Sequence, residues 1–187
     1  MAQAAIENLG AHADTLERVI RGISSRLGAG ATVYTAGNGG SAAEALHLAE
    51  ELVGRYRSNR RPLRAVCLAA DPTALTCIAN DFGFDEVFAR PCEALLRPDD
   101  CLVLFSTSGR SRNLIRAAEV ARRKGAWVIG LLGGDGGPLL PQCDEAVVVA
   151  ATPHGGVAAF DSAAVQEAHQ VILHALCEQL ELDFPAQ

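Results

Sequence analysis

Two short loops contain the groups best suited to hold an anionic ligand. The segment from Gly37 to Ser41 has the sequence GNGGS, and the segment from Ser106 to Ser111 has the sequence STSGRS, with four hydroxyl groups in six residues. The second segment directly precedes a predicted helix, whose free backbone N–H groups and dipole attract an anion. A solvated turn that only caps the helix is the alternative. The place of the segment 106–111 at the end of a predicted strand favours a phosphate site over such a turn.

A histidine and a glutamate on the helix after the glycine loop could supply acid–base chemistry. His47 and Glu51 are four residues apart and therefore share one helix face. An imidazole and a carboxylate at this spacing can hold a metal ion or act as an acid–base pair, and a plain surface pair is the alternative. Glu50 is expected to point elsewhere. The last predicted helix adds three more candidates, Gln166, His169 and His174.

The glycine loop also has to be compared with a nicotinamide site. Gly37, Gly39 and Ala42 match the pattern GxGxxA, which is a weak signal by itself. A dinucleotide fold places an acidic residue about twenty positions later to bind the ribose. The first candidate, Asp71, comes too late in the chain. The sequence therefore does not favour a nicotinamide cofactor.

Short apolar strands alternate with amphipathic helices along the whole chain, which predicts an α/β fold. The later strands are continuous apolar runs, as in a parallel sheet that is covered on both faces. We therefore predict one doubly wound, mainly parallel five-stranded sheet, with ligands beyond the carboxyl ends of its strands. The single domain would span residues 1–187, with an N-terminal helix at 1–28, a sheet core at 31–150 and a closing helix at 162–182. The expected strands are 31–36, 64–69, 102–105, 127–132 and 145–150.

Local signals place the helices that connect these strands. Ser41 and Glu44 have the spacing of a capping box, so a helix is expected from Ser41 to about Tyr56. The segment 72–96 is expected to be helical with a break near Pro91, and another helix covers 113–124. Because the first helix has an apolar face, it needs a surface to cover.

Composition excludes several classes of protein. The 187 residues are 49% hydrophobic and 20% charged, which is enough to form a core and rules out a disordered chain. The net charge of −6 and the lack of a basic stripe argue against nucleic acid as a ligand. No signal peptide and no apolar run of about 18 residues are visible, so we expect no membrane contact and a cytoplasmic protein. The six cysteines form no CxxC pair and are expected to be buried thiols without chemistry.

Four motifs, in order, resemble those of the phosphoheptose isomerases, which belong to the sugar isomerase (SIS) domain family. They are AGNGGSAAEALHLAEELVGRY (36–56), NDFGF (80–84), STSGRS (106–111) and QEAHQVILH (166–174). The resemblance implies interconversion of sedoheptulose 7-phosphate and D-glycero-D-manno-heptose 7-phosphate. It also implies a homotetramer whose sites lie near the subunit boundaries.

The resemblance assigns roles to individual residues. It implies that Glu51 is the base and His174 its partner, and that a zinc ion is held by His47, Glu51, Gln166 and His174. A helical rise of about 12 Å separates Gln166 from His174, so His169 remains a substitute ligand. The implied contacts with the sugar and its phosphate are Asn38, Gly39, Gly40, Ser41, Arg55, Asn80, Asp81, Ser106, Thr107, Ser108, Ser111 and Gln166. Departures from the family pattern at Arg110, Ala163, Ala164 and Val165, and a long loop at 152–159, leave the exact sugar open.

Two functions of other classes remain as alternatives. Aldose–ketose isomerisation through an enediol needs a base, an acid and a group that stabilises the oxyanion. A non-catalytic SIS protein that binds a protein partner, of the replication-initiator-associating type, would lack the glutamate at position 51. A domain that only senses a sugar phosphate would need the serine-rich loop but would have no use for His47 and Glu51. The residues present therefore favour the enzyme.

Overall fold

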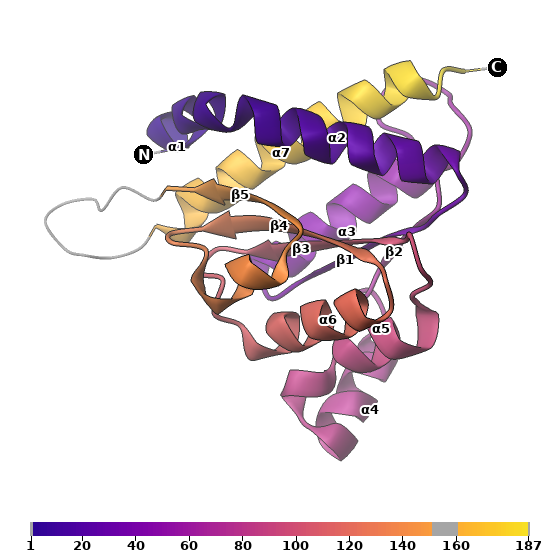
Figure 1. The fold of residues 1–187 in the computed structure, drawn as a ribbon, viewed down its shortest axis with the longest axis vertical. Coiled ribbons are helices and arrows are strands. Elements are labelled where there is room, and N and C mark those ends of the chain that lie inside the picture. The colour runs from indigo at the N-terminus through magenta and orange to yellow at the C-terminus, as the bar shows by residue number, and fades with distance from the viewer. Residues whose placement is uncertain (1, 151–160, 187) are drawn as a thin grey trace, which may run out of the picture.

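A five-stranded parallel sheet forms the centre of the computed structural model, which describes residues 2–150 and 161–186. The strand order is β2-β1-β3-β4-β5, which confirms the predicted fold class (Figure 1). The chain winds outward from β1 to β2 and then returns to β3 on the other side of β1, so the winding reverses between β1 and β3. The expected loop at 152–159 lies outside the described residues. The strands are β1 (Val33–Gly37), β2 (Ala65–Cys67), β3 (Cys101–Ser106), β4 (Trp127–Gly133) and β5 (Glu145–Val149).

Helices cover both faces of the sheet, and each face has its own hydrophobic core. In Figure 1, α2, α3 and α7 lie on one side of the sheet, and α4, α5 and α6 lie on the other. Among the described helices, none is long and apolar enough to cross a membrane. The helices are α1 (Ala2–Asn8), α2 (Ala13–Gly28), α3 (Gly40–Val53), α4 (Pro72–Phe82), α5 (Ala89–Leu95), α6 (Arg112–Arg123) and α7 (Ser162–Asp183), with 3-10 turns η1 (Leu9–His12), η2 (Phe84–Glu86) and η3 (Gly137–Gln142).

The N-terminal helix differs from the single helix that the sequence predicts. It consists of α1, the turn η1 and α2. Val19, Ile23 and Leu27 on α2 are buried in the core that also contains α3, α7 and one face of the sheet. The apolar face of this helix is therefore covered within the same chain and does not require a second subunit.

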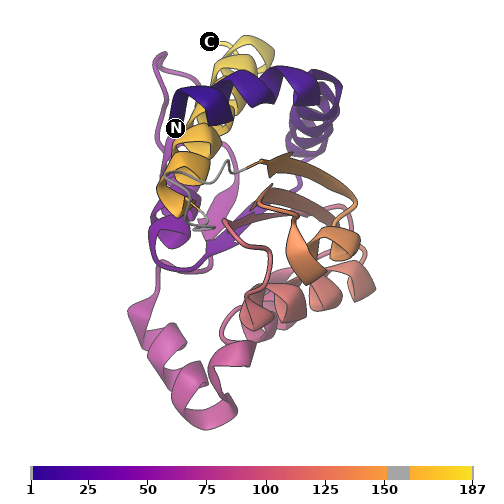
Figure 2. The ribbon, with the colours of Figure 1, turned by 90° about the vertical axis from the view of Figure 1, so that its left-hand side faces the viewer.

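The break in the helical segment after β2 lies at Gly83 and not at Pro91. Gly83 has a φ of +89°, which ends α4. Residues other than glycine rarely adopt this backbone conformation. Pro91 is in the first turn of α5, where a missing N–H group costs no hydrogen bond. The carboxylate of Asp71 caps α4 by accepting bonds from the N–H groups of Thr73 and Ala74. Helix α4 has no buried residue and projects from the body of the fold (Figure 2).

The predicted capping box at the start of α3 is wrong. The N-cap is Gly39, with a φ of +55° and no side-chain cap, while Ser41 and Glu44 are both buried. Helix α3 ends at Val53, short of the predicted Tyr56. The buried guanidinium of Arg60 donates to the carbonyl oxygens of Glu51 and Leu52 at 2.6 and 3.1 Å. A cation at this end of a helix satisfies free carbonyl groups and opposes the helix dipole.

The cysteines form no disulfide among the described residues, and most of them are inert. Burial raises the pKa of the thiols of Cys92, Cys101, Cys143 and Cys177 to about 12, so these groups stay protonated at neutral pH. Cys77 on α4 is exposed, contrary to the prediction of buried thiols.

Candidate active site

The fold brings the glycine loop and the serine loop together at the point where the winding reverses. Strands β1 and β3 are adjacent and parallel, and Gly37 pairs with Phe105 at their carboxyl ends. A cavity of about 120 Å³ lies between the two loops. It has no charged side chain in its lining, so its hydroxyl, amide and N–H groups would provide the bonds to an anion. The lining residues are Asn38, Ser41, Phe105, Ser106, Thr107, Ser108, Ser111 and Leu114.

The serine loop is held in one conformation by its neighbours. Gly109 has a φ of +62°, and a Cβ there would collide with the carbonyl oxygen of Gly136. The hydroxyl of Ser106 accepts a bond from the N–H of Gly109 at 3.0 Å, and the carbonyl of Gly109 accepts one from Leu139. Ser111 is the N-cap of α6 but makes no side-chain cap bond, so its hydroxyl is available to a ligand. The loop is thus a preformed site at a helix N-terminus.

Asn38 is fixed by a residue that the sequence analysis did not identify. Its side-chain amide exchanges two hydrogen bonds with that of Asn113, at 2.9 and 3.0 Å. Asn113 is buried in the first turn of α6, so the pair connects the glycine loop to the helix that follows the serine loop. The available signal was a polar residue at the second position of the helix, two residues after STSGRS.

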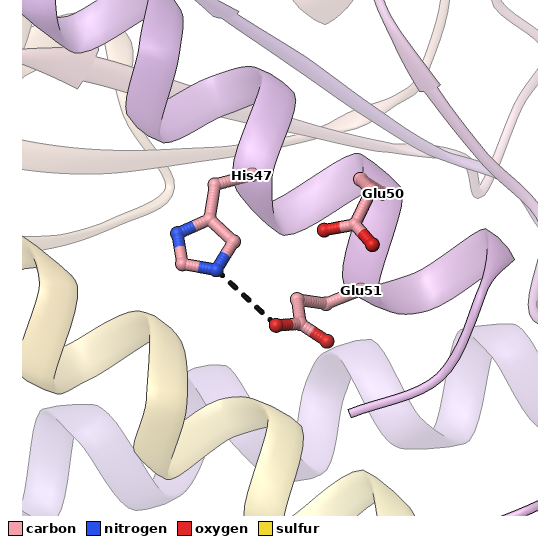
Figure 3. A group of neighbouring side chains, drawn as sticks. All are labelled: His47, Glu50 and Glu51. Carbon is pink, nitrogen blue, oxygen red and sulfur yellow. Dashed lines mark hydrogen bonds and ion pairs between the residues drawn. The ribbon is translucent and has the colours of Figure 1, made fainter. Parts of the chain in front are cut away.

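His47 and Glu51 lie together on α3, as predicted, and a third residue orients the imidazole. His47 Nε2 is 3.2 Å from Glu51 Oε1 (Figure 3). On the other side of the ring, His47 Nδ1 is 2.9 Å from Gln170 Oε1. When Nδ1 donates to the Gln170 oxygen, the ring is held with Nε2 facing the Glu51 carboxylate. A ring nitrogen and a carboxylate oxygen at this distance can share a proton or bind a cation between them. A histidine whose other nitrogen donates to an amide is also typical of a metal ligand.

Glu50 belongs to the same group, contrary to the expectation that it points elsewhere. One ligand atom from each of His47, Glu50 and Glu51 lies within 4.8 Å of the others. Figure 3 shows the Glu50 carboxylate on the same side of α3 as the other two side chains. This arrangement provides one nitrogen and two carboxylates, a ligand set that suits zinc.

Helix α7 packs His174 against the His47 ring and places Gln166 elsewhere. The rings of His174 and His47 are 5.3 Å apart, and Tyr56 stacks against His174 at 5.7 Å. Gln166 packs against Gly40, where a Cβ would overlap its side-chain amide. Gln170, one turn further along α7, is the glutamine that contacts His47. Its spacing of four residues from both Gln166 and His174 was the signal that could have identified it.

His169 is not a substitute for His174. Its side chain is completely buried and lies against Phe105 and Glu44, away from solvent. Gln166 and His174 therefore lie at two different places along α7. Gln166 contacts the glycine loop, and His174 contacts His47.

The other predicted contacts are outside this arrangement in the single chain. Asn80 and Asp81 lie exposed on α4, where the Asn80 amide donates to Asp81 at 2.7 Å. Arg55 is exposed just after α3. Arg110, which departs from the family pattern, pairs with Asp135 at 2.7 Å. None of these four predicted or variant positions lines the cavity between the loops.

Known proteins share both the sequence and the architecture. Residues 2–133 match the family model of the SIS domain. A phosphoheptose isomerase of Campylobacter concisus is 42% identical over 170 residues, which cover 91% of this chain and 86% of the relative. The structure of phosphoheptose isomerase from Neisseria gonorrhoeae has a TM-score of 0.84 at 35% identity, covering 96% of this chain and 92% of that one. The enzyme of Francisella tularensis gives 0.83 at 31% identity, covering 96% and 91%.

Proposed function

The chain belongs to the phosphoheptose isomerases of the SIS-domain family, and from this premise we propose that it interconverts sedoheptulose 7-phosphate and D-glycero-D-manno-heptose 7-phosphate. The observation that carries the proposal is the spacing of two glutamines of α7 that contact α3. Gln166 packs on the glycine loop, and Gln170, one helical turn or about 6 Å further on, contacts His47. A seven-carbon sugar with its phosphate at C7 and its reacting carbons at C1 and C2 needs separate places for its two ends.

The phosphate would bind in the cavity between the loops. We assign Ser106, Thr107, Ser108 and Ser111 to it, together with the free N–H groups of the first turn of α6. The sugar hydroxyl groups would contact Asn38, Gly39, Gly40, Ser41 and Gln166. In this arrangement the phosphate end is fixed by neutral donors, and the other end of the sugar extends towards His47 and Glu51.

The proton transfer would be carried out by Glu51 and His174. Glu51 takes a proton from C1 of the ketose and returns it to C2, while His174 moves a proton between the two oxygen atoms. Both residues lie at His47, which places a base and an acid at one position. Such a step passes through an enediol, so the transferred hydrogen exchanges with solvent.

A zinc ion fits the same residues. His47, Glu51 and His174 would hold it, with Glu50 as a further carboxylate. The resemblance also implies Gln166 as a ligand. Because Gln166 packs on Gly40, we assign it to the sugar instead. When bound, the ion would polarise the carbonyl group of the sugar. The 3.2 Å between His47 Nε2 and the Glu51 carboxylate supports this assignment.

We propose assembly as a homotetramer in the cytoplasm. Helix α4 carries Asn80 and Asp81 on an exposed surface beside Phe82 and Phe84, which are 51% and 61% exposed. Assembly would cover these rings and let α4, and Arg55 at the end of α3, complete a site near a subunit boundary. Light scattering at micromolar concentration tests this, and a monomer would refute it.

Turnover by the purified protein is the decisive test. Sedoheptulose 7-phosphate in D₂O should convert to the aldose with deuterium incorporation at the transferred position, as followed by NMR, and a panel of ketose phosphates then defines the sugar. Ser108→Ala should raise KM by about one to two orders of magnitude, because a bond to a charged group contributes about 1.5–3 kcal/mol. Sugar-phosphate binding without turnover would instead indicate a sensor, and the absence of both would indicate a partner-binding protein.

A further inference from the structure

Glu44 and His169 form a buried polar pair that the mechanism above does not use. Glu44 on α3 is 3% exposed and His169 on α7 is fully buried. His169 Nδ1 lies 3.6 Å from Glu44 Oε1, which is close enough for an ion pair but too long for a hydrogen bond. Neither carboxylate oxygen of Glu44 has a hydrogen-bond partner among the described residues, and nor does His169 Nδ1.

The geometry requires a proton between the two side chains. His169 Nε2 lies 3.4 Å from the carbonyl oxygen of Leu132, which can only accept, so Nε2 carries a hydrogen. In a neutral ring this leaves the lone pair of Nδ1 facing the carboxylate. Two buried acceptors in that position would repel each other, and a buried unpaired carboxylate is costly. The pair therefore holds one proton in common, on the imidazole or on the carboxyl group.

Stability alone does not explain such a pair. Replacing a buried ion pair by apolar residues of similar volume is often neutral or stabilising, so a pair of this kind is weak evidence for a structural role. Two of its contacts, in contrast, adjoin the candidate site. His169 lies edge-on to Phe105, which lines the phosphate cavity, and Leu132 pairs in the sheet with Ser106.

The pair also connects the two helices that carry the reacting groups. Glu44 is one turn before His47 on α3, and His169 is one turn after Gln166 on α7. Because α7 contributes Gln166 and His174 while α3 contributes His47 and Glu51, the relative placement of these helices decides whether the groups meet.

We propose that Glu44 and His169 are positioning residues whose shared proton sets α7 on α3, so that His174 meets His47 and Gln166 meets the glycine loop. This inference rests on the proposed isomerase function for its kinetic consequence, but its structural consequence can be measured without turnover. Residues that hydrogen-bond a metal ligand typically change activity or metal affinity by about 10–100-fold when they are replaced, and we expect the same range for a pair that positions the helix carrying His174.

A set of four variants separates positioning from simple packing. Glu44→Gln is the conservative variant, since its amide can donate to Nδ1 of neutral His169, and it should retain activity close to that of the parent. His169→Phe, Glu44→Leu and the double variant Glu44→Leu/His169→Phe should lose about 10–100-fold in kcat. Binding of inorganic phosphate should stay within about threefold of the parent, because the serine loop is on β3 and α6. The double variant should melt close to the parent, since it replaces both members of the buried pair by apolar side chains.

The contradicting outcome is equally definite. If the double variant recovers both the melting temperature and the kcat of the parent, the pair only fills space and the proposal is wrong. If Glu44→Leu does not fold, His169→Phe, which keeps a ring against Phe105, decides the question, and an unchanged kcat overturns the proposal.

A second readout keeps this test apart from the proposed function. The NMR signals of the His174 ring report its position beside His47 and Tyr56 in any folded variant. They should shift in the double variant and stay in place in Glu44→Gln. If the parent shows no heptose turnover but these shifts appear, the proposed function fails and the positioning role stands. Unchanged His174 signals in the double variant refute the positioning role whatever the parent catalyses.

Discussion

Replacing Glu51 by glutamine tests the assignment of the base most directly. Its side chain is 14% exposed and lies 3.2 Å from His47 Nε2. Glutamine has nearly the same volume and keeps an oxygen in that place, so the fold should not change. It removes the negative charge, and with it the ability to take a proton or to bind a cation.

The two interpretations of Glu51 predict effects of very different size. If Glu51 only pairs with His47 near the surface, the pair contributes at most about 1 kcal/mol, which corresponds to at most about fivefold in any constant. If it is the base, kcat should fall by about 10²–10⁴, equivalent to roughly 2.7–5.4 kcal/mol of transition-state stabilisation. Phosphate binding should remain within a few fold, since no residue of α3 beyond Ser41 lines the phosphate cavity.

The assay follows the conversion of sedoheptulose 7-phosphate by NMR and the binding of sugar phosphate by calorimetry. Glu17→Gln is the matched control, because Glu17 also pairs with a side chain four residues away, that of Arg21, but on an exposed face of α2. The control should leave kcat and KM unchanged. A kcat for Glu51→Gln within fivefold of the parent would refute the mechanism proposed for Glu51.

Two further predictions concern the loop and the fold. Gly109→Ala should lower kcat/KM at least tenfold, because the added Cβ collides with the Gly136 carbonyl. Gly30→Ala is the control: Gly30 has a φ of +91° and open space around it, so this variant shares only the backbone strain and should keep its activity. Equal activity of both variants would mean that the loop is not held as described. Arg18 donates two hydrogen bonds to Glu145 and thereby lowers the pKa of that carboxyl group. The stabilisation by this ion pair is therefore fully present above the ordinary glutamate pKa of about 4.3, and it is lost as the pH falls through the lowered value. Arg18→Ala should therefore melt below the parent at pH 7, and the difference should shrink as the pH is lowered through the acid range. A difference that stays the same at low pH would contradict this reasoning.

The period of the hydrophobic pattern and the composition of each segment were sufficient to predict the architecture. Short continuous apolar runs are typical of strands buried on both faces, and their alternation with helices predicts a parallel sheet. Because the carboxyl ends of adjacent parallel strands lie at one edge, the glycine and serine loops were expected to meet, and they do. Likewise the spacing of four residues was enough to bring His47 and Glu51 together, since it depends only on the helix repeat.

Contacts between distant segments could not be obtained in this way. Ser41 and Glu44 have the pattern of a capping box, yet tertiary packing buries both, and Glu44 faces His169, 125 positions further along the chain. A local motif describes only neighbours within one turn, whereas burial depends on which face meets the sheet. The same holds for Asn113, whose amide pair with Asn38 exists only because α6 packs beside the glycine loop.

The sequence by itself thus determined the elements, their order and the types of residue available for phosphate binding and proton transfer, because these follow from local periodicity and chemistry. Only the tertiary structure decided which side chains of α7 meet which partners: Gln170 and His174 lie at His47, Gln166 at Gly40 and His169 at Glu44. All four share the same helix within three turns, so their spacing alone allows many ligand sets. The rotation and height of α7 on α3 select one, and these are set by packing across the whole core.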